Sequence, residues 1–140
     1  MERKIRIAPV TAERLDSETP HRLKAAMFKK LVREYDKSCG RDYDTIAFDI
    51  SDYKDEMLFA ELFKNGDVMM RVFCFAFGKG KYSEYGNLEI VFSEKKPSEN
   101  GEQRIRADLD RLFDGLVRCG ILRERDGFAE QYRLVFLGVV

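Results

Sequence analysis

The segment from residue 100 to residue 137 constrains the fold most, because it joins an amphipathic helix directly to a pattern of two short strands. Its apolar side chains recur at helical spacing, and they are Ile105, Leu109, Leu112, Phe113, Leu116 and Val117. Gly120 follows them at a position where helices commonly end. Two strand-like runs then flank Asp126-Gly127, a pair that favours a tight turn. We therefore predict a helix followed by a β-hairpin.

The order of these elements, carried by the strings DLDRL, GIL and YRL, resembles the recognition helix and wing of winged-helix DNA-binding domains. The resemblance covers residues 102–137 and not a full domain, because a strand-like run at 87–93 and a polar linker precede the helix. It implies that Arg104, Arg106 and Arg111 reach phosphates or base edges. The same pattern also occurs at the end of an α+β domain whose last strand joins the main sheet.

Elsewhere the chain alternates strand-like and helix-like patterns and has no internal repeat. We expect strands over 4–10, 45–50, 67–77 and 87–93, and helices over 20–38 and 54–63. Thr19 is the expected cap of the first helix and Pro20 its first residue. The order βαβαββαββ predicts a single α+β domain over residues 1–140. Its three helices would pack on a mixed or antiparallel sheet of about five or six strands.

The run at 67–77 is apolar at both alternating sets of positions except for Arg71, which predicts a central strand covered on both faces. The strand at 87–93 would pair with it across a loop at 78–86. We expect one core that contains Val72, Phe73, Phe75, Leu88, Ile90, Phe113 and Leu116.

The net charge is zero, because the 140 residues include 25 lysines and arginines and 25 acidic residues. A protein that binds nucleic acid mainly through non-specific phosphate contacts usually has a positive net charge. The neutral net charge of this chain is therefore modest evidence against that role. The chain has three cysteines and no pair of them has metal-site or redox spacing. It shows neither a signal-peptide core nor a membrane-spanning run, so we expect a cytoplasmic protein without a membrane partner.

Few residues could support catalysis. His21 is the single histidine, and it lies about 27 Å from Cys39 along the same predicted helix, at ~1.5 Å per residue. Only four cysteines and histidines exist for a zinc site, so we expect no metal and no cofactor. The Gly78–Lys81 loop lacks the spacing of a phosphate-binding loop. We therefore expect a protein that is not an enzyme.

Two charged segments are the best candidate contact surfaces. The segment 22–37 is basic, and its candidate contact residues are Arg22, Lys29, Lys30, Arg33 and Lys37. Lys79 and Lys81 could join them on a phosphate backbone. The segment 42–61 is acidic, and its candidate contact residues are Asp49, Asp52, Asp55 and Glu56. Both segments could instead be solvated faces without a partner.

The leading hypothesis is a non-enzymatic binding protein that acts stoichiometrically on a nucleic acid or a nucleoprotein complex. An alternative is a small inhibitor or adaptor of the kind found in phages and mobile elements, such as an anti-defence protein, which would bind a protein target through the acidic surface. A second alternative is a magnesium-dependent nuclease, with Asp49 and Asp52 or with Asp108, Asp110 and Asp114 as ligands.

Overall fold

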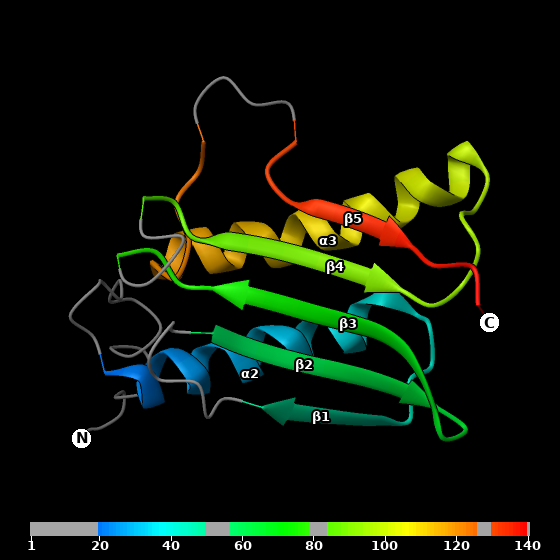
Figure 1. Cartoon of the computed structure of the whole chain (residues 1–140), viewed down its shortest axis with the longest axis horizontal. Coiled ribbons are helices and arrows are strands. Elements are labelled where there is room, and N and C mark those ends of the chain that lie inside the picture. Colours follow the sequence, from blue (N-terminus) through cyan, green and yellow to red (C-terminus); the bar gives the residue numbers. More distant parts are fainter. Residues whose placement is uncertain (1–19, 50–56, 79–83, 126–129, 140) are drawn as a thin grey trace, which may run out of the picture.

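The computed structural model describes residues 20–49, 57–78, 84–125 and 130–139. Within these ranges the chain forms two helices and five strands. In chain order they are α2 (His21–Cys39), β1 (Thr45–Asp49), β2 (Met57–Lys64), β3 (Asp67–Phe75), β4 (Asn87–Phe92), α3 (Glu99–Cys119) and β5 (Arg133–Phe136). The strands form one sheet, and both helices lie on the same face of it (Figure 1). The α+β class is confirmed.

The sheet has the strand order β1-β2-β3-β4-β5. Neighbouring strands are antiparallel except β4 and β5, which are parallel, so the sheet is mixed, one of the two predicted alternatives. A parallel neighbour requires a long crossover connection, and α3 provides it between β4 and β5. The described chain therefore ends as a β-α-β unit attached to an antiparallel meander.

The predicted number and order of helices are wrong, because the described residues hold two helices in the order αββββαβ. The helix expected over 54–63 is replaced by the strand β2. Leu58, Ala60 and Leu62 alternate with partly exposed neighbours along β2, a period of two and not of 3.6. The strand predicted over 4–10 lies outside the described residues.

The turn after β2 explains this error. Asn65 and Gly66 both have positive φ angles, 53° and 85°, and they join β2 to the antiparallel strand β3. Asn-Gly with positive φ at both positions is the preferred two-residue hairpin turn. The same pair is also common where a helix ends, so the local sequence favours both structures, and here it forms the tip of a hairpin.

The predicted carboxyl-terminal hairpin is also wrong. Residues 121–125 form no strand, and β5 pairs with β4 instead of with a preceding hairpin partner. Ile121 and Leu122 are buried, and the carbonyl of Ile121 accepts a hydrogen bond from the amide of Phe77 (2.9 Å). Burial and backbone pairing beyond the end of β3 thus hold this segment against the body of the domain.

The first helix begins one residue later than predicted. Pro20 has the extended backbone of an N-cap (φ −56°, ψ 142°), and α2 runs from His21 to Cys39, with Gly40 in the left-handed conformation as its C-cap. Thr19 lies outside the described residues. The inward side of α2 carries Phe28 and Val32, both 0% exposed, and the helix packs beside α3. The amphipathic pattern therefore predicted the element correctly.

The core lies between the sheet and the two helices. Val72, Leu88, Ile90, Phe113 and Leu116 belong to it, as predicted. Phe73 and Phe75 do not, because the odd-numbered side chains of β3 point to the opposite face and are only half-buried. The prediction that this strand is covered on both faces is wrong for the described residues, since the helices cover one face only (Figure 1).

Candidate functional site

The two helices lie side by side on the sheet but differ in charge. Helix α2 carries six lysines and arginines and two acidic residues, a balance of +4. Helix α3 carries four arginines and five acidic residues, a balance of −1. Because both helices bury an apolar stripe, these charges lie mostly on the outer side of the helical layer. The positive charge of the helical layer is thus concentrated on α2.

The predicted contact residues of α2 form one surface, which we call the basic flank: Arg22, Lys29, Lys30, Arg33 and Lys37. All are exposed except Lys29, which is half-buried. Lys29, Arg33 and Lys37 follow each other at four-residue steps, about 6 Å apart along the helix axis. The sixth base, Lys24, is 1% exposed and points into the domain, so it is not part of this surface.

The edge strand β1 positions two cations of the basic flank. The Nζ atom of Lys29 and the Cζ atom of Arg33 lie 5.7 Å and 5.2 Å from the ring centroid of Phe48. The Phe48 ring in turn packs edge-on against Phe28 of α2, with ring centroids 6.1 Å apart. An aromatic face attracts cations, so Phe48 holds both side chains beside the sheet edge.

The basic flank is not neutralised by the rest of the described chain. None of its five cations forms an ion pair with a carboxylate of the described residues. Several other arginines are paired: Arg41 with Glu94, Arg71 with Glu61, Arg106 with Glu102, Arg111 with Asp108, and Arg133 with Glu89. The basic flank therefore has a local positive potential that can attract an anionic partner.

The predicted contact residues of α3 are arranged differently. Arg106 is held by Glu102 (Nε to Oε2, 3.0 Å) and Glu130 (3.7 Å), and Arg111 is paired with Asp108. Arg104 is exposed. Paired guanidinium groups have already satisfied part of their hydrogen-bonding capacity, so Arg106 and Arg111 have less capacity for an anion than the basic flank.

Most of the other candidate residues cannot be placed. Asp49 is exposed at the end of β1, whereas Asp52, Asp55 and Glu56 lie outside the described residues, as do Lys79 and Lys81. The predicted acidic surface therefore stays a prediction. The described part of the chain holds no group of three side chains suited to a metal ion.

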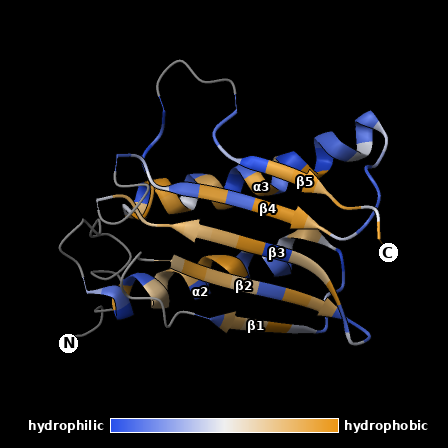
Figure 2. Ribbon diagram, in the orientation of Figure 1, coloured by the Kyte–Doolittle hydropathy of each residue, from blue (hydrophilic) through white to orange (hydrophobic). Residues whose placement is uncertain are grey.

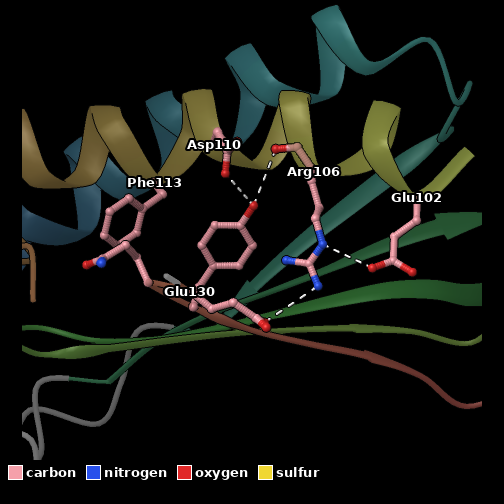
Figure 3. A pocket seen from close by; sticks show the side chains of 7 residues that line it. Glu102, Arg106, Asp110, Phe113 and Glu130 are labelled. Atoms are coloured by element: carbon pink, nitrogen blue, oxygen red, sulfur yellow. Dashed lines mark hydrogen bonds and ion pairs between the residues drawn. The ribbon is translucent and has the colours of Figure 1, made fainter. Parts of the chain in front are cut away.

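Sequence reasoning missed a pocket of about 450 Å³ beside α3 (Figure 3). Its lining residues are Glu102, Arg106, Asp110, Phe113, Glu130, Gln131 and Tyr132. The hydroxyl of Tyr132 donates to Oδ1 of Asp110 at 2.6 Å. Burial, together with this hydrogen bond to a carboxylate, raises the pKa of Tyr132 above its usual range. Only tertiary contact brings residues 130–132 against α3, so no local pattern could reveal the pocket.

None of the three cysteines, Cys39, Cys74 and Cys119, is in a disulfide. Burial raises the pKa of Cys74, and it also raises that of Cys39. A raised pKa disfavours the thiolate, which is the nucleophilic form. Burial therefore lowers the reactivity expected of the Cys39 and Cys74 thiols.

Comparison of the chain with protein families, curated proteins and solved structures finds no match. The winged-helix resemblance of residues 102–137 thus stays a prediction. Within the described ranges, neither helix has the length and apolar character needed to cross a membrane.

Proposed function

We propose that the protein is a non-enzymatic binding protein that contacts a nucleic acid, alone or in a nucleoprotein complex, through the basic flank of α2. One observation carries the proposal: five cations share one helix surface, and none is paired with a carboxylate of the described residues. Phosphate groups would supply the complementary negative charge. Each engaged phosphate releases condensed counterions, which favours binding.

The spacing of the basic flank suits a phosphate backbone. From Arg22 to Lys37 the flank extends about 22 Å along the helix axis, and a duplex carries one charge per ~1.7 Å of its axis. Several phosphates can therefore face the flank at once. The contact residues are a row of charges along one helix surface, which suits the evenly spaced phosphates, so we expect little sequence preference.

The neutral overall charge is compatible with this function because binding depends on local charge. The acidic residues of α3 lie on the other helix, and several of them are already engaged in pairs with arginines. They would orient the protein so that α2 and not α3 faces the phosphates. A cytoplasmic location is part of the proposal and is supported by the three free cysteines.

The test measures the affinity of the full chain for a short fluorescent DNA duplex by anisotropy. Lys29→Gln, Lys30→Gln and Arg33→Gln are combined in one variant. Loss of three phosphate contacts should weaken binding by at least about tenfold at low salt. A single-stranded DNA and an RNA hairpin of similar length, measured in parallel, identify the preferred form.

The matched control combines Arg104→Gln, Arg111→Gln and Arg118→Gln on α3, which removes the same amount of charge from the other helix. This variant should bind within about threefold of the parent, because only a weaker long-range attraction is lost. Equal weakening by both variants would show that net charge alone governs binding. Undiminished binding by the α2 variant would reject the basic flank as the contact surface.

A further inference from the structure

The face of the sheet opposite the helices is apolar along its central strands. Figure 2 shows β2 and β3 coloured as hydrophobic over most of their length, with both helices behind the sheet. Along the central strands, half-buried outward side chains alternate with fully buried inward ones. We call this surface the open face, and its apolar members are Met57, Phe59, Phe63, Phe73, Phe75 and Val91.

An aromatic pair lies at the centre of the open face. Phe59 and Phe73 are directly opposite each other on β2 and β3. Their ring centroids are 4.9 Å apart, with an angle of 43° between the ring planes. Central aromatic side chains surrounded by other apolar groups are typical of the residues that dominate binding energy in protein interfaces.

Two arginines of the open face are each paired with a glutamate of a neighbouring strand. Nε of Arg71 lies 2.9 Å from Oε2 of Glu61, and Nε of Arg133 lies 3.4 Å from Oε2 of Glu89. Each pair is neutral, so neither arginine offers an uncompensated positive charge to a phosphate backbone. Two copies of the face can therefore approach each other without repulsion between these pairs.

The area of the open face is close to the smallest area that a specific homodimer interface buries on each copy. Five strands ~4.8 Å apart, each of four to nine residues at ~3.4 Å per residue, give roughly 500 Å². Two copies would together bury about 1,000 Å², the lower limit for a specific interface.

We propose that the open face is the interface of a symmetric homodimer in which the sheets of two copies pack face to face. A twofold axis near Phe59 and Phe73 would bring the aromatic pairs of both copies together, and the paired charges would surround them. Sheets pack in this way at about 10 Å separation. The helices then form the two outer layers, so the basic flank stays accessible in each copy.

The test is the mass of the full chain in solution by sedimentation velocity over a range of micromolar concentrations. One chain has a mass of 16.3 kDa, and the parent should sediment as a species of twice that mass. The combined variant Phe59→Thr/Phe73→Thr introduces β-branched side chains, which suit a strand. It should raise the dimer dissociation constant by about a hundredfold or more, because the central aromatic groups are lost.

Leu23→Thr is the control, since Leu23 is an exposed apolar residue of α2 (41%) outside the open face, and it should leave the dimer intact. Circular dichroism checks that each variant is folded. A second measurement uses the unaltered chain: a mixture of isotope-labelled and unlabelled copies should give intermolecular NMR contacts at Phe59 and Phe73.

A parent that stays monomeric at the highest concentration overturns the proposal. So does a dimer that lacks these intermolecular contacts, or a monomer whose binding to single-stranded oligonucleotide is lost in Phe59→Thr/Phe73→Thr. The basic flank is not altered in these variants, so the nucleic-acid proposal stands or fails separately.

Discussion

The helices α2 and α3 occupy equivalent places on one face of the sheet, yet their outer surfaces differ. Both end at a glycine in the left-handed conformation and both bury an apolar stripe against the same core. On α3, Arg106 and Arg111 are paired with acidic neighbours. On α2, the basic flank has no ion pair within the described residues. Packing therefore dictates the inner side of each helix, and the outer sides differ in how their cations are paired within the described residues.

The largest expected effect tests whether both helices are equally necessary for the fold. Phe28 of α2 and Leu116 of α3 are 0% exposed. Phe28→Ala should lower the free energy of unfolding by about 3–5 kcal/mol and Leu116→Ala by about 2–5 kcal/mol, because each leaves a cavity in the core. Chemical denaturation measures both. A loss below about 1 kcal/mol in only one of them would show that its helix is peripheral.

A smaller effect is expected from the pKa values of two tyrosines, one near each helix. Burial raises the pKa of Tyr43 to about 12, and the neighbouring Arg41 guanidinium limits the increase. Burial raises the pKa of Tyr132 further, and there the hydrogen-bonded neighbour is the carboxylate of Asp110. Each phenol is therefore held neutral in the folded chain at a pH where the unfolded chain, with a pKa of about 10, begins to ionise.

The unfolded state releases protons first, so the contribution of these tyrosines to stability should be constant below pH of about 10 and fall as the pH rises above it. Denaturation curves between neutral pH and pH of about 12 measure this loss. Tyr43→Phe should make the decline shallower. Tyrosinate absorbance should appear for Tyr43 before Tyr132, and the reverse order would contradict the placement of Arg41 and Asp110 beside them.

Local patterns predicted α2, α3 and the pairing of β3 with β4, but not the parallel pairing of β4 with β5. The apolar spacing of Leu109, Leu112 and Leu116 is contained within one element, so the sequence alone identifies α3. The pairing of β5 with β4 depends on contacts between residues about 40 positions apart, such as Phe92 and Phe136, whose rings stack at 5.3 Å. The local turn signal at Asp126-Gly127, which lies outside the described residues, favoured a hairpin, whereas β5 pairs with β4.

The candidate site could be predicted only where its residues lie within one element. Helical spacing alone predicts that Arg22, Lys29, Arg33 and Lys37 lie along one stripe of their helix. No pattern indicates that Phe48 of β1 holds Lys29 and Arg33, because that contact joins a helix to a strand edge. The open face could not be predicted, because the pattern over 54–63 favoured a helix. A helix there leaves no strand that could place Phe59 opposite Phe73.

The salt dependence of duplex binding tests the role of the basic flank most directly. The logarithm of the binding constant should fall linearly with the logarithm of the salt concentration, by ~0.9 for each phosphate neutralised. Lys29→Gln/Lys30→Gln/Arg33→Gln should flatten this slope by up to about three units, and Arg104→Gln/Arg111→Gln/Arg118→Gln should leave it unchanged. An unchanged slope in the α2 variant, or an equally flattened slope in the α3 variant, would contradict the assignment of phosphate contacts to α2.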